Sequence, residues 1–457
     1  MLHLKDLIPL WDDTIIASAD ATLSVNKPAY AECVMQFDAP HEGSGTNFFT
    51  VIQDEDRYRL YYETWTFPHL ESISVCYAES KDGLRWDRPD LGDGTNVIIP
   101  RIEDNFTVMK DPNPACPPEH RYKATMEDKV DGIKSLVIRS SADGIHFKHF
   151  GIINQGYGID SQNTLHWDRR TQKYYCYFRE NLKPEDGDTL WKETPLRTVM
   201  VTESPDCIHW STPVPLDYRV GEIYPLYTNC ISPYYYDDRY YIGLPTRYVE
   251  RREWNDNYDQ LSGKELRRQK YEQNKRYGLA VTDCVFMHSA DHYHWHRFDE
   301  AILTPGPEYK TNWFYGDCYP AAGKMTELSP GELSFFVRQR NAENHDLIEL
   351  HRYTYRKDGF ASYKAGYQPC TLLTKPFTFE GVALSVNFRT SARGHLFAEV
   401  LDEAATPIPG YTSCEYFGDS LERFIRFEKP LSALQGKPIR LKFILRDGEL
   451  FSLHFHK

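Results

Sequence analysis

The first 365 residues alternate between short apolar or aromatic runs and clusters of turn residues. Residues 47–52, 58–62 and 73–77 are three such runs, and an acidic turn at 54–56 separates the first two. Comparable runs recur at 121–125, 136–139, 164–167, 174–178, 231–236, 240–243, 333–337 and 347–350. Runs of this length that are rich in aromatic and β-branched residues predict antiparallel strands joined by hairpins. A further strand is predicted at 30–37, ahead of the first hairpin unit.

One turn sequence recurs between these runs. Residues 80–86 read Ser-Lys-Asp-Gly-Leu-Arg-Trp, and copies of this form occur at 141–147, 204–210 and 289–295, with a shorter copy at 357–360. Repeats of this length, with strands inside each unit, are typical of propeller blades. Asp and Gly tolerate turn backbone and the Ser hydroxyl bonds locally, so we interpret the copies as structural turns. They predict five blades.

The pattern changes after residue 366. Short strands with period-2 alternation are predicted at 384–388, 424–427, 439–443 and 450–455, and the Asp-Gly repeat is absent there. Such strands with Gly and Pro turns predict a small antiparallel sandwich. The expected fold is therefore all-β, with a five-bladed β-propeller over residues 1–366 and a C-terminal antiparallel β-sandwich over residues 367–457.

The fourth unit contains an insertion near residues 250–277, rich in Glu, Arg, Lys and Gln. Residues 261–276 predict a polar helix. Such a segment is either a solvated surface excursion, a lid or a contact between subunits, and a homo-oligomer fits the last of these.

Composition narrows the classes of function. The chain has 457 residues, 41% of them hydrophobic, and a net charge of −13, which argues against a nucleic-acid partner. No run reaches 18 apolar residues and the first 28 residues lack an apolar leader, so we expect no membrane partner. The ten cysteines include no CxxC pair, which favours reduced thiols in the cytoplasm.

Several segments resemble a known family. Residues 110–112, Lys-Asp-Pro, resemble the Arg-Asp-Pro of fructosidases, with Lys in place of Arg. Segments 77–83, 121–124, 160–163 and 357–362 are similar to a bacterial set of glycosidases of poorly defined specificity. The chain thus resembles the five-bladed β-propeller glycoside hydrolases of the fructosidase, arabinanase and xylosidase type, which carry an appended β-sandwich. The resemblance implies hydrolysis of a small glycoside or oligosaccharide, with carbohydrate as the partner and no cofactor.

Glycoside hydrolysis uses two carboxyl groups, a protonated acid and an ionised base or nucleophile. A propeller brings residues beside the inner strands of different blades to one central funnel. The catalytic candidates are acidic residues beside predicted inner strands: Asp111, Asp160, Glu180 and Glu42. Asp111 corresponds by blade number to the stabilising Asp of related propellers. We expect Asp111 and Asp160 to share one cavity, and which carboxylate is the acid stays open.

The substrate-binding candidates are Gln162, Asn163, Arg179, Arg247, Trp65 and Asp317. Each arginine ends an aromatic stretch, where it forms a structural ion pair or grips a sugar hydroxyl or carboxylate. Trp65 either stacks on a sugar or is wedged between blades. Alternate histidines at 288–296 belong to the fourth turn, and we assign no metal.

Two other functions fit the same pattern. One is a carbohydrate-binding propeller without catalysis, and the other is a scaffold for protein partners. Loss of turnover with retained binding, after mutation of Asp111 and Asp160, would favour the enzyme over the first alternative. A large exposed apolar face would favour the scaffold.

Overall fold

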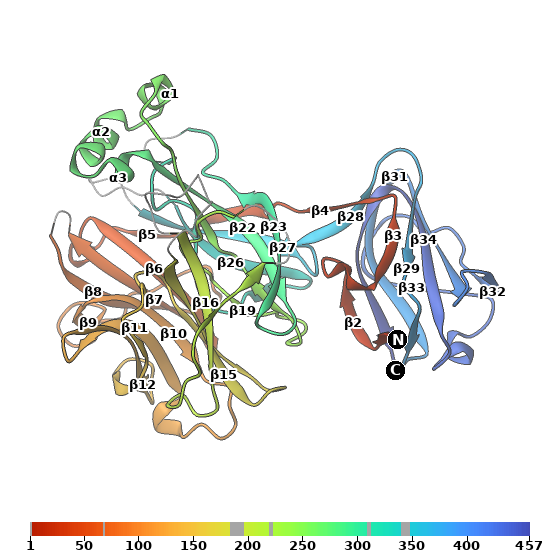
Figure 1. The fold of residues 1–457 in the computed structure, drawn as a ribbon, viewed down its shortest axis with the longest axis horizontal. Coiled ribbons are helices and arrows are strands. Elements are labelled where there is room, and N and C mark those ends of the chain that lie inside the picture. The colour runs from red at the N-terminus through yellow and green to blue at the C-terminus, as the bar shows by residue number, and fades with distance from the viewer. Residues whose placement is uncertain (1, 67–68, 183–195, 219–222, 309–311, 340–347) are drawn as a thin grey trace. The chain divides into compact units, whose positions relative to one another are not determined.

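The computed structural model describes residues 2–66, 69–182, 196–218, 223–308, 312–339 and 348–457. The chain divides into two compact units. The larger consists of Ala29–Leu328 and Leu333–Thr354, and the smaller of Met1–Pro28, Ser329–Glu332 and Tyr355–Lys457. Strands dominate both units, as the sequence predicted (Figure 1).

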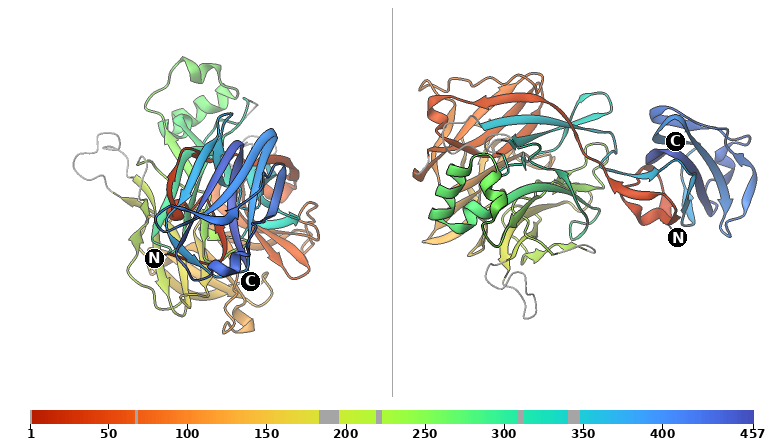
Figure 2. Two further views of the ribbon diagram at one scale, coloured as in Figure 1. Left: turned by 90° about the vertical axis from the view of Figure 1, so that its right-hand side faces the viewer. Right: turned by 90° about the horizontal axis from the view of Figure 1, so that it is seen from above.

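In the described part of the larger unit, the strands form five separate sheets, which are the blades of a five-bladed β-propeller (Figures 1 and 2). Blade one contains β6 (Gly45–Asp54), β7 (Arg57–Thr66), β8 (His69–Ser80) and β9 (Val97–Ile102). Blade two contains β10 (Asp104–Lys110), β11 (Tyr122–Val130), β12 (Ile133–Ser141) and β13 (Lys148–Gln155). Blade three contains β14 (Thr164–Asp168), β15 (Lys173–Leu182), β16 (Leu196–Ser204) and β17 (Val214–Pro215).

Blade four is built on the same plan, with short extra strands. It contains β18 (Asp217–Tyr218), β19 (Ser232–Pro233), β20 (Tyr241–Gly243), β21 (Thr246–Glu250), β22 (Ala280–Ser289) and β23 (His294–Leu303). Blade five contains β24 (Tyr319–Pro320), β25 (Thr326–Ser329), β26 (Glu332–Gln339), β27 (Ile348–Arg356) and, from the start of the chain, β5 (Ala29–Phe37). Two short 3-10 turns, η2 (Pro40–Glu42) and η3 (Pro118–His120), lie in connections.

Strand β5 closes the ring. It pairs antiparallel with β27, from Phe37 opposite Ile348 to Ala29 opposite Thr354. The strand itself was predicted, but its partner was not, because pairing over such a sequence distance leaves no local pattern.

Aromatic residues fill the spaces between neighbouring blades. One buried cluster joins blade one to blade two, with Tyr61 of β7 close to Phe106 of β10 at a centroid distance of 6.4 Å. Equivalent clusters join blades two and three, three and four, and five and one. The high aromatic content therefore serves first to pack the blades, since large flat side chains bury the most apolar area per residue.

The four full copies of the Ser-Asp turn share one hydrogen-bond pattern. In the first, the Asp82 carboxylate accepts from the Leu84 and Arg85 amides at 2.8 and 2.9 Å and from the Ser80 hydroxyl at 3.0 Å. The other copies repeat the Ser–Asp bond at 2.8, 3.1 and 3.2 Å. These turns follow β8, β12, β16 and β22, the same position in blades one to four. The fifth copy differs, because Asp358 is fully buried in the smaller unit and accepts from Ser452 at 2.5 Å.

Replacing Asp82 with Ala is expected to destabilise the propeller by about 1 kcal/mol, the net worth of a turn hydrogen bond. Any catalytic activity should be nearly unchanged, because this turn lies at the third connection of its blade. Thermal unfolding and activity of the same preparation test both statements. A variant with normal melting and no activity would contradict them.

The insertion in blade four folds as three short helices, α1 (Asp256–Gln260), α2 (Lys264–Gln273) and α3 (Lys275–Leu279), rather than the single helix predicted (Figure 1). The Asn274 side chain accepts from the Arg276 amide and so starts α3. Arg267 is fully buried, donates to the Gly278 carbonyl at 3.1 Å and lies over Phe314. The segment is therefore packed onto the blade. None of the helices in the described ranges combines the length and apolar character needed to cross a bilayer.

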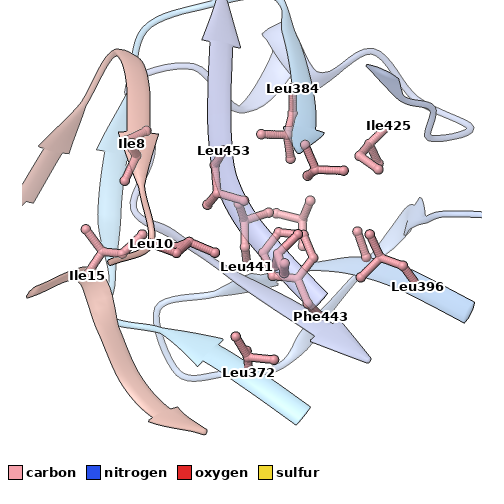
Figure 3. Close-up of a cluster of buried hydrophobic side chains, with 14 of the residues drawn as sticks. Ile8, Leu10, Ile15, Leu372, Leu384, Leu396, Ile425, Leu441, Phe443 and Leu453 are labelled. Carbon is pink, nitrogen blue, oxygen red and sulfur yellow. The ribbon is translucent and has the colours of Figure 1, made fainter. Parts of the chain in front are cut away.

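The smaller unit has one hydrophobic core enclosed by a continuous sheet. Its described strands are β1 (Leu2–Leu4), β2 (Asp6–Pro9), β3 (Ile16–Ala19), β4 (Thr22–Val25), β28 (Ala361–Ala365), β29 (Cys370–Thr374), β30 (Phe377–Phe379), β31 (Ala383–Asp402), β32 (Pro407–Thr412), β33 (Asp419–Ile425) and β34 (Ile439–His456). Two 3-10 turns, η1 (Asp13–Ile15) and η4 (Leu431–Leu434), complete it. The core side chains meet between the strands, which is consistent with a β-sandwich (Figure 3).

The observed boundaries differ from the expected division at residue 366. Strand β2 pairs with β34, and β1 pairs with β30, so the start of the chain belongs to the smaller unit. Leu7, Ile8 and Leu10 are buried there. The apolar side chains of the first residues thus find their partners in the C-terminal strands rather than in a blade.

Candidate active site

Asp104 and Asp160 lie near the starts of the inner strands of adjacent blades. Asp104 is the first residue of β10, and Asp160 lies just before β14. Burial raises the pKa of Asp104 to about 7, and the negative charge of Asp160 adds to this effect. The two carboxyl groups therefore lie within electrostatic reach of each other, and Asp104 holds its proton up to near-neutral pH.

Glu63 of β7 joins this pair from blade one. Its side chain is fully buried, and Oε1 accepts from the Phe106 amide at 2.5 Å. Burial raises the pKa of Glu63 well above its ordinary value, and the negative charge of Asp104 adds to this effect. Glu63 therefore favours its protonated form beside Asp104.

Arg179 of β15 is the cation nearest to Asp160. Its Nη2 lies 3.6 Å from Asp160 Oδ2, and its Nε donates to the Gly158 carbonyl at 2.8 Å. The Arg179 side chain is 5% exposed, whereas that of Asp160 is 51% exposed. Solvent therefore reaches the Asp160 carboxylate. The Arg179 guanidinium is buried and is held in place by its hydrogen bond to the Gly158 carbonyl.

Tyrosines border the same cluster. Tyr227 lies beside Asp160 and Arg179, and its ring centroid is 5.5 Å from that of Tyr319 and 6.1 Å from those of Tyr248 and Tyr315. The helical insertion contributes Tyr277, which stacks on Tyr315 at 6.0 Å. Aromatic faces beside a carboxyl pair are suited to contact with the apolar face of a sugar ring.

Three further predicted residues support the loop that carries Asp160. Glu180 accepts from the amides of Gly158 and Asn181, at 3.0 and 2.6 Å. Gln162 is buried and donates to the Phe49 carbonyl at 2.7 Å, and Asn163 donates to the Ile159 carbonyl at 3.0 Å. Gln162 and Asn163 thus use their side-chain amides to bond backbone carbonyls of the protein. The polar run 160–163 therefore serves to position Asp160.

The sequence predicted that Asp111 and Asp160 would share one cavity. The cavity that Asp111 lines does not include Asp160. Asp111 follows the last residue of β10, so the strand separates it from Asp104 by roughly 20 Å. Its buried carboxylate accepts from the Lys123 ammonium, the Tyr174 hydroxyl at 2.8 Å and the Asn113 amide at 2.9 Å. These contacts make Asp111 part of a satisfied buried ion pair at the opposite end of the inner strand.

Glu42 also lies in a satisfied network. It is 1% exposed and accepts from the Tyr62 hydroxyl at 2.6 Å, Arg88 Nε at 2.8 Å and the Ala39 amide at 2.9 Å. This network joins η2 to blade one.

The remaining predicted residues make structural contacts. Arg247 forms an ion pair with Asp283 at 2.6 Å, the alternative that the sequence left open. The Trp65 ring lies against Gly45, where a Cβ would meet it at 2.3 Å. Asp317 is buried just before β24, and its carboxylate accepts from the Cys318 amide at 3.0 Å.

A cavity of about 1080 Å³ lies at the other end of the inner strands, and its lining includes Asp111, Asp168, Asp238 and Lys324. Its acids are ion-paired. Burial alone would raise the pKa of Asp168, but hydrogen bonds from His292 and Arg170 outweigh it and lower that pKa. Asp238 pairs with Arg169 at 2.6 Å. Among the described residues, the raised carboxyl pKa values of Asp104 and Glu63 favour the Asp104–Asp160 cluster as the site of acid–base chemistry.

Sequence reasoning missed Glu63 and Asp104. Asp104 lies just ahead of the largely apolar run 106–109, as Asp160 lies ahead of the run 164–167, and this placement was a usable signal. Glu63 lies inside a strand and carried no signal, since an acid there reads as a solvent-facing residue.

No family model and no curated protein matches the chain. Among solved structures, an N-acetylgalactosamine deacetylase from F. plautii in complex with blood group B trisaccharide is similar, with 13% identity, 74% of this chain and 96% of that chain covered, and a TM-score of 0.50. A glycoside hydrolase shares 12% identity over 72% of this chain and 92% of its own, with a TM-score of 0.45. The α-L-arabinofuranosidase Arb93A from Fusarium graminearum shares 10% over 74% and 99%, with a TM-score of 0.40. At 13% identity, the likeness to the first of these structures concerns the fold alone.

Proposed function

We propose that the chain is a glycoside hydrolase that acts on a small glycoside or oligosaccharide. The observation that carries the proposal is the carboxyl pair of Asp104 and Asp160. Asp104 has a raised pKa, and Asp160 is exposed to solvent beside Arg179. This is the combination of protonated acid and ionised partner that glycoside hydrolysis needs. The fold is also one on which the F. plautii protein was solved with a trisaccharide.

In the proposed mechanism, Asp104 is the general acid and delivers its proton to the leaving oxygen. Asp160, accompanied by Arg179, is the ionised carboxylate that acts as base or nucleophile. Burial disfavours the ionised forms of both Asp104 and its neighbour Glu63, and this keeps Asp104 protonated up to near-neutral pH. The bordering tyrosines would hold the sugar ring.

The proposal is tested with purified protein and a panel of aryl glycosides and short oligosaccharides, with sugar release as the measurement. Turnover of at least one substrate is expected, and Asp160→Asn should reduce it by roughly 10²–10⁴-fold. Asp131→Asn is the matched control, because Asp131 is exposed in the β11–β12 turn at φ 52°, which Asn tolerates. Binding without turnover across the panel would replace the enzyme with a carbohydrate-binding propeller.

We also propose a cytoplasmic location. None of the ten cysteines, all within the described ranges, forms a disulfide, as suits a reducing compartment. Fractionation of the source cells, with an antibody against the chain, is the test.

A further inference from the structure

Arg197 of β16 is a buried cation beside the carboxyl cluster. It is 8% exposed, and its guanidinium carbon lies 4.2 Å from the ring centroid of Tyr248 and 5.8 Å from that of Tyr227. Within the described ranges, no carboxylate lies within ion-pair distance of Arg197. Burying a charge without a counter-ion costs free energy, so this position is explained by a partner that arrives with the ligand.

Two further guanidinium groups face the same tyrosines. Arg179 lies 5.9 Å from the Tyr227 centroid, and its contact with Asp160, at 3.6 Å, is longer than a normal charge-assisted hydrogen bond. Arg276 of α3 acts electrostatically on Tyr248 and Tyr315, and its buried Nε has no hydrogen-bond partner in the described part of the chain. Three arginines thus lie at this end of the inner strands, together with the solvent-exposed carboxylate of Asp160.

We propose that the sugar bound at this site carries a carboxylate, as a hexuronic acid does, and that Arg197 binds that carboxylate. The inference rests on the proposed function and names its substrate class. A planar guanidinium fork matches a planar carboxylate through two parallel N–H···O bonds. Tyr248 stacks under the Arg197 fork and limits its orientations, which lowers the entropic cost of gripping the ligand.

The three cations come from separate segments, and this gives the insertion in blade four a role. Arg179 and Arg197 lie on neighbouring strands β15 and β16, where Arg197 is opposite Asn181. Arg276 comes from α3 of the insertion in blade four. We therefore interpret the insertion as adding a third arginine to Arg179 and Arg197, rather than as a detached surface excursion. Arg276 would contribute charge to the bound carboxylate without being essential for its geometry.

The test is direct binding, measured by titration calorimetry with D-glucuronate and D-galacturonate against glucose and galactose. Uronates are expected to bind at least tenfold more tightly than the neutral sugars, the scale of a hydrogen bond to a charged group. Arg197→Gln should remove this preference and leave the weak neutral binding unchanged, and Arg197→Lys should restore part of it. Arg393→Gln is the matched control, an exposed arginine over Tyr367 in the smaller unit.

The outcomes separate this inference from the proposed function, because binding needs no turnover. Equal affinity for uronates and neutral sugars, or an unchanged preference in Arg197→Gln, would overturn the carboxylate inference even if a neutral glycoside is hydrolysed. Tighter binding of glucose 6-sulfate than of glucuronate would also overturn it in favour of a sulfated sugar. Uronate binding that depends on Arg197 would uphold it even if no hydrolysis is detected.

Discussion

Replacing Asp104 with Asn is expected to lower kcat/KM by roughly 10²–10⁴-fold, the range that a positioned acid contributes. Asn keeps the size of the side chain but holds no transferable proton. Wild-type activity should fall as pH rises through about 7, because Asp104 acts in its protonated form. The residual activity of the variant should lack this alkaline limb. A pH–rate profile from pH 4 to 9 checks both statements.

Stability gives the same substitution a second readout. The pKa of Asp104 is raised from 3.8 to about 7, so the folded state binds this proton more tightly than the unfolded state. The stabilisation from the bound proton is therefore complete below pH 3.8 and is lost as pH rises through about 7. Asp104→Asn should remove this loss, so wild type should lose more stability than the variant between pH 4 and pH 8. An inactive variant that is also destabilised at pH 8 would show a structural role instead.

Replacing Asp111 with Ala is expected to destabilise the propeller by about 3–5 kcal/mol, the cost of leaving a buried charge without its partner. The Lys123 side chain is only 3% exposed and that of Asp111 is 0% exposed, so water does not replace the lost carboxylate. Denaturant unfolding measures the effect. Below its melting temperature the variant should still turn over substrate, because Asp111 lies at the far end of β10.

The double variant Asp111→Leu with Lys123→Met is the control for this cost. Removing both charges should recover most of the lost stability, since a well-packed apolar pair often replaces a buried ion pair without penalty. If Asp111→Ala keeps full stability and loses all turnover, the catalytic role first predicted for Asp111 stands, and the Asp104 assignment fails.

The sequence was a good guide to the blades. Period-2 runs and the Ser80–Asp82 type of turn have local physical causes, so they predicted the strands, their hairpins and the number of blades. The pairing of β5 with β27 and of β2 with β34 escaped prediction because a strand carries no sign of which distant edge it joins. The domain boundaries were displaced for the same reason.

Two residues of the proposed site, Asp160 and Arg179, were among the sequence candidates, and Asp104 and Glu63 were not. The sequence favoured Asp111 over Asp104 because polar residues flank both ends of the run 106–109. Inner strands of successive blades run in the same direction, so residues that precede their strands converge and a residue that follows its strand does not. The free charge of Arg197 had no sequence signal, because it depends on which side chains the fold leaves unpaired.

The closure of blade five by β5 has a consequence for how the protein is made. On the ribosome β5 emerges early, while β27, its partner, emerges only after four blades have been synthesised. Strand β2 stays without its partner for longer, because that partner, β34, is the last strand to be synthesised. Until then both carry open backbone edges that invite pairing with other nascent chains. Slow translation or a shortage of chaperones should therefore increase aggregation of the incomplete chain.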